Sequence, residues 1–344
     1  MAIGHYGGAH ETGMIQDAAG DAERKIISIL EILSESSEPL GSTTIARELE
    51  RRGISLSERA VRYHLRITDE RGYTRPAGRD GRTITPAGQE EIREAMAPAH
   101  LGFIREKLET LAFQTTFDPQ KKTGLLSVNT SLIDKERFPE VITAMKPVFR
   151  AGLAVSDLVV SAAEGEKLGS VIIPAGKVGL GTVCSVVTNG VLLKAGVPTD
   201  YRFGGLLEVR NSNARRFVAI IEYAGTSLDP SEQFIRARMT SVNEVVRTGS
   251  GKILGVFRTM PGPARGILEE KIAELKEAGI RAVFTVGGTS EPICQIPVGL
   301  NRMGVIQLGG LNPIAAAVEA GFQIESIAES GLIEYERLMS AAEL

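Results

Sequence analysis

The sequence predicts an α+β protein, in which an N-terminal winged helix-turn-helix precedes a duplicated ferredoxin-like module of βαββαβ type. Three observations carry this prediction. Three helical patterns lead into a basic hairpin, the rear of the chain repeats itself at a nearly constant offset, and each repeat alternates strands and helices in the same order. With 344 residues, 43% of them apolar, the chain is long enough to bury separate cores.

The front of the chain has the pattern of three short helices. Apolar residues recur at intervals of three and four from Ile26 to Leu33, which places them on one helix face. A second helix begins after a threonine pair, and Ser57 can cap a third, which stops at Gly72. Residues 1–21, before the first helix, show no apolar period and are expected to form a flexible tail.

The third helix has a cationic face and a packing face. At 100° per residue its arginines and Tyr63 lie together, while Val61 and Leu65 face the opposite way. The hairpin that follows has a two-residue turn signal at Asp80-Gly81. Helices and hairpin in this order indicate a winged helix-turn-helix, whose third helix enters the major groove while the wing follows the phosphates. The predicted DNA-binding residues are Ser57, Arg59, Arg62, Tyr63, Arg66, Arg79 and Arg82.

Positive charge is concentrated in this part of the chain. Residues 51–82 contain nine arginines and four acids, a balance of +5 within a chain of net charge −3. The planar fork of arginine can bind guanine or phosphate. A solvated helix face, or a winged helix that binds protein, would also carry charge. Nine arginines without a lysine, followed directly by the hairpin, favour DNA.

The chain is predicted to divide into four segments. A tail (1–21) precedes the winged helix-turn-helix (22–90), a helical linker (91–118) and a regulatory domain (119–344). The linker pattern is broken at Pro98, and it can also supply a dimer contact.

The regulatory domain contains an internal repeat, over about 122–210 and 250–340. Each copy holds a strand, a helix, two strands, a short helix and a last strand, which is the order of a ferredoxin-like unit. Two such units can pack sheet to sheet or side by side. At an offset of 123 residues, Pro174, Gly176, Gly181 and Asn189 match Pro297, Gly299, Gly304 and Asn312.

A glycine turn in the second repeat is the candidate ligand site. In QLGGLNP, a strand runs into Gly309-Gly310 and a helix follows Asn312, without the G-x-G-x-x-G or Lys-Ser/Thr pattern of a nucleotide loop. Two interpretations stay open, a tight turn in which Asn312 caps the helix and an anion site at the helix start. The cation for a dicarboxylate can come from Arg202, Arg302 or Lys177. The predicted effector-binding residues are Gly309, Gly310, Asn312, Thr188, Asn189 and Arg302.

Catalytic, metal and cofactor sites are not predicted. No Ser-His-Asp set and no paired carboxylates at an apolar strand end stand out, and the four histidines are scattered without ligand spacing. Cys184 and Cys294 lie in apolar runs without a nearby histidine, so both are expected to be reduced and buried. Neither an export signal nor an apolar run of membrane-spanning length is present, which favours a cytoplasmic protein.

The chain resembles the nitrogen-repressor (NrpR) family. The residues that carry the resemblance are SERAVRYHLRITDERGYTR and GRDGRTITPAG in front, and GLGTVCSVVTNGVLLKAGVPTDYRFGGLLEV, EYAGTSLDP, GSGKIL and LGGLNPIAAAVEAG behind. The resemblance implies a ribonuclease-R-type winged helix and one regulatory domain, in a dimeric transcription repressor of nitrogen-assimilation genes that responds to 2-oxoglutarate. The implied partners are double-stranded DNA, that dicarboxylate and a second copy of the chain. Some members of the family carry two regulatory domains.

Two other functions stay open at this point. An enzyme of small-molecule metabolism with an accessory winged helix would show turnover. An RNA-binding regulator would prefer single strands, although no aromatic stacking platform accompanies the arginines.

Overall fold

The computed structural model describes residues 22–23, 25–36, 38–78, 80–92 and 104–344. The predicted tail, Arg79 and most of the predicted linker before α5 lie outside these residues. The chain divides into two compact units, Met1–Leu101 and Gly102–Leu344. Within the described parts of both units, no helix is long and apolar enough to cross a membrane.

The first unit is a winged helix, as predicted. Residues 25–34 form a helix, α2 and α3 follow, and β1 and β2 form a hairpin before helical residues 86–92. The cap expected for α3 is present, since Ser57 Oγ accepts a hydrogen bond from the Ala60 N–H at 3.3 Å. The core consists of fully or nearly fully buried side chains of the three helices: Ile29, Ile32, Leu33, Ile45, Leu49, Val61 and Leu65. The bounds are Ser42–Arg51 (α2), Glu58–Glu70 (α3), Thr74–Pro76 (β1) and Arg82–Ile84 (β2).

The turn of the wing is longer than predicted. The strands β1 and β2 leave residues 77–81 as their connection, in place of a two-residue turn at Asp80-Gly81. The reason is a third segment beside the hairpin, because Leu40 forms a β-bridge with Arg82. Gly81 has a φ of 120°, and a Cβ there would lie 2.2 Å from the carbonyl oxygen of Leu40. A glycine is therefore required where the two backbones meet.

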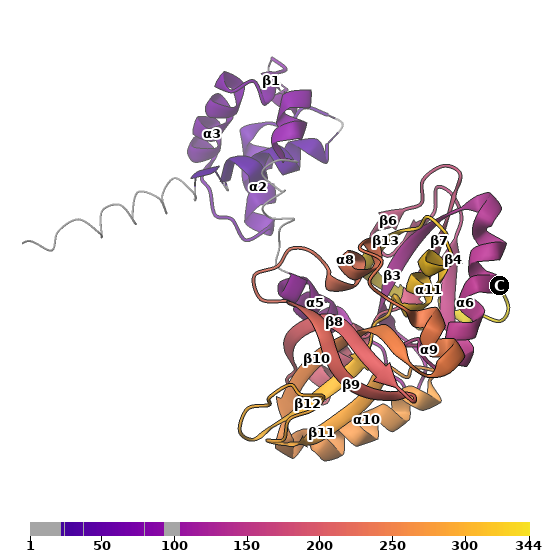
Figure 1. The fold of residues 1–344 in the computed structure, drawn as a ribbon. Coiled ribbons are helices and arrows are strands. Elements are labelled where there is room, and N and C mark those ends of the chain that lie inside the picture. The colour runs from indigo at the N-terminus through magenta and orange to yellow at the C-terminus, as the bar shows by residue number, and fades with distance from the viewer. Residues whose placement is uncertain (1–21, 24, 37, 79, 93–103) are drawn as a thin grey trace, which may run out of the picture. The chain divides into compact units, whose positions relative to one another are not determined.

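The second unit contains two five-stranded antiparallel sheets, in the orders β11-β12-β10-β8-β9 and β13-β3-β7-β4-β14 (Figure 1). A two-stranded hairpin, β5-β6, belongs to neither sheet, and its turn contacts β13, where the Ser170 N–H donates to the carbonyl oxygen of Ser330 at 2.7 Å. The strand bounds are Leu125–Asp134 (β3), Leu158–Ala162 (β4), Lys167–Leu168 (β5), Val171–Ile172 (β6), Lys177–Val183 (β7), Asp200–Arg210 (β8), Asn213–Glu222 (β9), Gly251–Pro261 (β10), Val283–Thr289 (β11), Arg302–Leu308 (β12), Glu325–Glu334 (β13) and Met339–Ser340 (β14).

The two copies of the repeat exchange their last strands. The strands β3, β4 and β7 belong to the first copy, but the strand paired with β3 is β13, the last strand of the second copy. Likewise β8, the last strand of the first copy, pairs with β10 in the other sheet. The repeat pattern did not predict this exchange, because identities at a fixed offset do not show which sheet a strand joins. Each sheet is therefore assembled from both copies.

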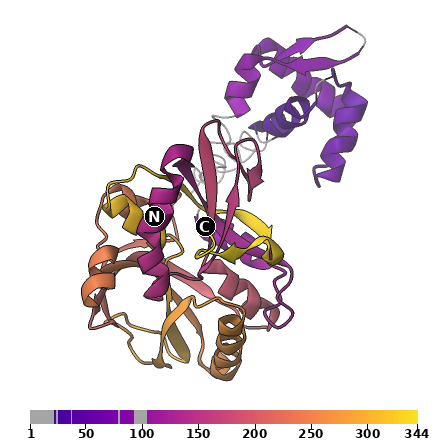
Figure 2. The ribbon, with the colours of Figure 1, turned by 90° about the vertical axis from the view of Figure 1, so that its right-hand side faces the viewer.

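The helices cover the sheets in pairs. Helix α6 packs on α11, and α7 packs on both α10 and α5. Helices α6 and α10 lie at the outside of the unit in Figure 1, and in Figure 2, where the right-hand side of that view faces the reader, α6 lies in front. Helix α5, which the sequence analysis places in the linker, buries Ile104, Leu108 and Leu111 within this unit. The helix bounds are Ile104–Gln114 (α5), Phe138–Arg150 (α6), Val186–Lys194 (α7), Pro230–Arg236 (α8), Val242–Thr248 (α9), Arg265–Glu277 (α10) and Asn312–Glu319 (α11).

The glycine pair before α11 lies against neighbouring segments. A Cβ on Gly309 would be 2.5 Å from the Cβ of Leu254. A Cβ on Gly310 would be 2.5 Å from Nδ2 of Asn129 and 2.8 Å from the carbonyl oxygen of Val183. These distances are far below van der Waals contact. Gly309 is therefore needed for packing on β10 of the same repeat, and Gly310 for packing on elements of the first repeat.

We expect Gly310→Ala to lower the free energy of unfolding by about 1–3 kcal/mol, because the added methyl group must push the backbone of β7 away. Chemical unfolding of the full chain measures this change. Gly266→Ala in α10 is the matched control, since a Cβ there meets nothing within 4 Å. Alanine should raise stability at that helical position by about 0.5–1 kcal/mol. Equal effects of the two substitutions would contradict the packing explanation.

Candidate functional site

Helix α3 presents an arginine face to solvent. Val61 and Leu65 are fully buried on its packing face, whereas Tyr63 is 56% exposed. Two of the arginines form exposed ion pairs with described residues, Arg62 with Glu58 at 3.7 Å and Arg66 with Glu70 at 3.6 Å, and the Arg66 guanidinium lies 5.7 Å from the centre of the Tyr63 ring. Such pairs contribute little free energy and can be exchanged for phosphate. The structure thus places together on one face the exposed residues Arg59, Arg62, Tyr63 and Arg66.

The arginines that the wing exposes to solvent differ from those predicted. Arg82 is turned into the domain, where its Nε donates to Oδ2 of Asp69 at 2.8 Å and the side chain is 27% exposed. Asp69 also accepts from Thr74 Oγ1 at 2.6 Å, so this carboxylate ties both wing strands to α3. Arg79 lies outside the described residues. Arg75 is exposed on β1 and makes no ion pair with any described residue. The sequence could have indicated this exposure, because neighbouring residues of a strand face opposite sides and Thr74 is buried.

Asn312 has a structural role. Its Oδ1 accepts from the Leu254 N–H at 2.8 Å, and its Nδ2 donates to the carbonyl oxygens of Leu153 and Leu254, each at 3.1 Å. The side chain does not cap α11, which begins after Leu311 without a side-chain cap. Because all its hydrogen-bonding groups are in use and it is fully buried, Asn312 offers nothing to a ligand.

The other predicted effector residues lie in two places. Thr188 and Asn189 are buried in α7, where Asn189 Oδ1 accepts from Gln307 Nε2 at 3.1 Å. Thr188 Oγ1, Asn189 Nδ2 and Gln307 Oε1 have no hydrogen-bond partner among the described residues. Arg302 lies at the other end of β12, about 16 Å along the strand from Gln307. Its Nε and Nη2 donate to Thr259, each at 2.9 Å.

An arginine that the sequence analysis did not single out is buried near Gln307. Arg258 on β10 is 1% exposed, and its guanidinium carbon lies 4.6 Å and 4.7 Å from the ring centroids of Tyr201 and Tyr223. Its Nε and Nη1 have no hydrogen-bond partner among the described residues. The alternation of β10 gave the signal, because Arg258 falls between the buried Val256 and Met260 on one face. Unsatisfied buried donors are costly, and the two tyrosine rings compensate the buried charge only in part.

A buried carboxyl group lies in the same region. Glu329 is in a bulge of β13, between Ile327 and Gly331, with a φ of 47°. Its Oε1 accepts from Cys184 Sγ at 3.8 Å, and its Oε2 has no partner among the described residues. Burial, followed by the nearby Asp229 carboxyl, raises the pKa of Glu329 well above its ordinary value. A protonated Glu329 is a hydrogen-bond donor. We call Tyr201, Tyr223, Cys184, Arg258 and Glu329 the Arg258 site.

Helix α5 covers the Arg258 site. Its apolar side chains Ile104 and Leu108 belong to one buried cluster with Tyr201 and Tyr223. At its outer side, Lys107 Nζ donates to the carbonyl oxygen of Ala328 at 2.8 Å, beside the bulge of β13. The site is thus closed by the first described helix of the second unit.

Asp229 should make the stability of the protein depend on pH. Burial raises the pKa of Asp229 to about 6, against an ordinary value of 3.8. The folded state therefore holds this proton more tightly, so its contribution to stability is complete below pH 3.8 and is lost as the pH rises to about 6. The Asp229→Asn protein has no carboxyl to titrate at this position. Over this pH range we therefore expect its free energy of unfolding to fall by up to about 3 kcal/mol less than that of the wild type. The amide still accepts from the Glu232 N–H, as the carboxylate does at 2.9 Å.

Thermal unfolding of both proteins between pH 4 and pH 7 measures this difference. Asp134→Asn, which changes an exposed carboxylate of the same unit, is the control. Parallel stability curves for wild type and Asp229→Asn would show that the buried carboxyl does not titrate in this range.

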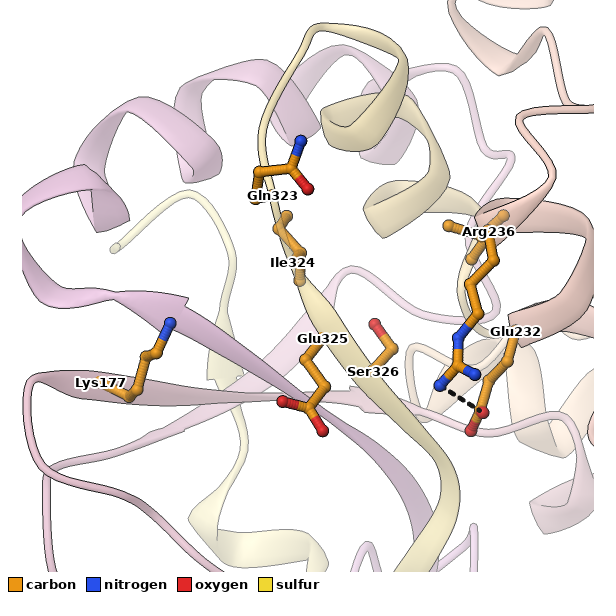
Figure 3. A pocket seen from close by; sticks show the side chains of 8 residues that line it. Lys177, Glu232, Arg236, Gln323, Ile324, Glu325 and Ser326 are labelled. Atoms are coloured by element: carbon orange, nitrogen blue, oxygen red, sulfur yellow. Dashed lines mark ion pairs between the residues drawn. The ribbon is translucent and has the colours of Figure 1, made fainter.

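A cavity of about 360 Å³ lies between α8 and the ends of β7 and β13 (Figure 3). Lys177 lines it, one of the cations considered for a dicarboxylate, but its Nζ pairs with Asp134 at 2.6 Å. Figure 3 shows the Arg236 guanidinium directed at Glu232, 3.7 Å away. Both cations are thus paired with carboxylates of the chain. Across the described residues, no three His, Cys, Asp or Glu side chains gather as a metal site requires.

A winged helix with an exposed arginine face, joined to a unit with a covered polar site, defines a transcription regulator. The chain belongs to the NrpR family of nitrogen regulators. Its residues 101–340 match the family model "NrpR regulatory domains NRD1 and 2", and residues 27–92 match "Ribonuclease R winged-helix domain". These matches confirm the predicted family and the predicted fold class.

Named relatives agree with this assignment. The global nitrogen regulator NrpRI of Methanosarcina mazei is 39% identical over 316 residues, which cover 92% of this chain and 97% of that protein. The global nitrogen regulator NrpR of Methanocaldococcus jannaschii is 32% identical, over 92% of this chain and 55% of that protein. The crystal structure of a nitrogen repressor-like protein from Methanococcus jannaschii matches with a TM-score of 0.58 at 27% identity, over 69% of this chain and 97% of that one. The chain is thus a regulator of nitrogen metabolism, as predicted, and not an enzyme.

Proposed function

We propose that the chain is a cytoplasmic homodimeric repressor of nitrogen-assimilation genes that binds double-stranded DNA and is released by 2-oxoglutarate. The observation that carries the DNA-binding part is the exposed arginine face of α3, set on a fully buried apolar core. The relatives are named as global nitrogen regulators, which supports the choice of target genes.

In this proposal α3 enters the major groove. Arg59, Arg62 and Arg66 contact base edges and phosphates there, with Tyr63 beside them and Ser57 at the helix start. In the wing, Arg75 and Arg79 contact phosphates. Arg82 acts differently, because its bond to Asp69 holds the wing against α3. The wing arginines therefore divide into contact residues and a positioning residue.

The Arg258 site is the proposed effector site. A carboxylate of 2-oxoglutarate would accept hydrogen bonds from Nε and Nη1 of Arg258, the two donors that lack a partner. Neutral Glu329 would donate to the same ligand, and Asn189 Nδ2 is a further unpartnered donor nearby. Of the effector residues predicted from sequence, Asn189 and Thr188 remain in this proposal. Gly309, Gly310 and Asn312 support the framework beside them.

Ligand entry would require α5 to move, because this helix covers Tyr201 and Tyr223. The chain reaches α5 from the winged helix through residues 93–103, so a displacement of α5 acts on the segment that leads to the DNA-binding unit. A ligand that prefers the displaced state shifts the population toward it. A coupling of about 1–3 kcal/mol corresponds to a change of 5- to 150-fold in DNA affinity.

Gel-shift titration with DNA from upstream of a nitrogen-assimilation gene tests the proposal, at two salt concentrations and with or without 2-oxoglutarate. We expect preference for duplex DNA over single-stranded RNA, a steep salt dependence, and weaker DNA binding with ligand. Light scattering should give twice the mass of the chain. Equal affinity for RNA, or DNA affinity that ignores millimolar 2-oxoglutarate, would contradict the corresponding part of the proposal.

Arg75→Gln should weaken binding to all DNA sequences alike and lower the slope of log K against log salt by about 1, because one phosphate contact is lost. The same titrations, with operator and unrelated DNA, measure both effects. Arg51→Gln, at the end of α2, is the control for loss of one exposed arginine. If Arg75→Gln changes base preference and leaves the salt slope unaltered, the wing does not contact the phosphates as proposed.

A further inference from the structure

A second cavity lies on the face of β10 opposite to the Arg258 site. It has a volume of about 420 Å³ and is formed over β8, β9, β10 and β12, which lie side by side in one sheet (Figure 1). Its floor is aromatic, since Phe203 and Phe257 stack at 5.1 Å. Ile220 of β9 lines one side and is 46% exposed, and Ile296 and Pro297 line the other. The cavity thus combines an apolar floor with a size that suits a small metabolite.

Charged side chains from three strands of the sheet line this cavity. Arg302 on β12 is held in place by its two bonds to Thr259, and Arg202 on β8 lies 3.5 Å from Asp200. Glu222 on β9 faces the cavity from the far side, is exposed, and makes no ion pair with any described residue. In the order β12-β10-β8-β9, three strand spacings place the backbones of Arg302 and Glu222 about 14 Å apart, whereas Arg202 is on β8, one strand from Glu222. Arg302 and Glu222 thus lie at opposite sides of the cavity, with Arg202 and Asp200 between them.

We propose that this cavity binds a small zwitterion, an amino acid with an apolar side chain. The carboxylate would be bound by Arg202 and Arg302, the ammonium group by Glu222, and the side chain would cover Phe203 and Phe257. The carboxylates of Asp200 and Glu222 line the same space and repel a second negative charge. A dicarboxylate is therefore disfavoured here. This site stands independently of the effector proposed for the Arg258 site.

Arg202 and Arg302, with Lys177, were predicted from the sequence as alternative cations for an effector. The structure brings both to one cavity, away from the glycine turn, and adds an acid that the sequence did not connect with them. Glu222 pairs with Phe203 in the register of β8 and β9, which places it at the cavity edge. The combination depends on the β12-β10-β8-β9 order and thus on the strand exchange between repeats.

Calorimetry of the full chain with L-leucine tests this site, against 4-methylpentanoate, which lacks the ammonium group, and 3-methylbutylamine, which lacks the carboxylate. We expect L-leucine to bind at least tenfold more tightly than either. Glu222→Gln should reduce leucine affinity about tenfold and leave 4-methylpentanoate unchanged, whereas Arg202→Gln should weaken both acids. Glu277→Gln, at the exposed end of α10, is the matched control and should change neither.

Absence of heat with millimolar L-leucine would overturn the proposal. Equal affinity for leucine and 4-methylpentanoate, or leucine binding that Glu222→Gln does not alter, would overturn it as well. Both substituted side chains are exposed, so the variants should remain folded, and their unfolding temperatures check this. Arg258→Met should not change leucine binding, which separates this site from the proposed effector site.

Discussion

Arg258→Met is expected to abolish the release of DNA by 2-oxoglutarate while DNA binding itself persists. The substitution removes the two unpartnered donors, Nε and Nη1, that the ligand would use. Each hydrogen bond from a charged group contributes about 1.5–3 kcal/mol, so ligand affinity should fall more than 100-fold. Stability should not fall, because an apolar side chain of similar length replaces an incompletely paired buried charge. Calorimetry with 2-oxoglutarate and gel shifts with increasing ligand measure the two effects.

Two further variants make this result decisive. Arg215→Met removes an exposed arginine of β9 and should leave the response to ligand unchanged. Glu329→Gln keeps a neutral donor of similar volume, so it should retain ligand binding and remove the decline in affinity expected as the Glu329 carboxyl deprotonates at higher pH. A folded Arg258→Met protein with wild-type ligand affinity would place the effector elsewhere.

Replacing the three arginines of α3 together by glutamine should abolish sequence-specific DNA binding. Arginine contacts to bases contribute about 1–3 kcal/mol each, so the combined loss should exceed 100-fold. The helix should remain folded, because these side chains are exposed and the buried face of α3 is untouched. Gel shifts with operator and unrelated DNA measure the change. The substitutions are Arg59→Gln, Arg62→Gln and Arg66→Gln.

The matched control changes net charge by the same amount in the second unit. It combines three arginines whose residues are exposed in the structure, Arg137→Gln, Arg210→Gln and Arg247→Gln. If this control loses as much DNA affinity as the α3 variant, the effect comes from total charge and the proposed contact surface is wrong.

Local patterns in the sequence were sufficient for the first unit. Apolar residues that recur at helical spacing predicted the buried face of α3, and the cap at Ser57 is formed as expected. The wing turn was misjudged because its length depends on Leu40, a residue about 40 positions earlier in the chain. The inward turn of Arg82 toward Asp69 depends on how the hairpin packs on α3, which the residues of the hairpin alone do not show.

The second unit shows where sequence patterns stop being informative. The repeat predicted the order of strands and helices, but strand pairing over long distances is not encoded in a local period. The candidate site was drawn toward Gly309 and Gly310, residues that signal a close approach of backbones whether or not a ligand is present. Arg258 gave a clearer signal, because it is a charged residue at an inward position of an apolar strand. Its significance became clear only from the structure, in which the side chain is buried.

The exchange of last strands affects how this protein can be made in the cell. Thr130 on β3 and Ser330 on β13 share a hydrogen bond of 2.7 Å, although they are 200 residues apart in the chain. While a ribosome synthesises the intervening segment, one edge of β3 has no neighbour, and contacts of such large sequence separation form slowly. An unprotected strand edge is a site of association between nascent chains. The regulatory unit therefore completes its fold only after β13 has been synthesised, and a product truncated before β13 would lack a strand in one sheet.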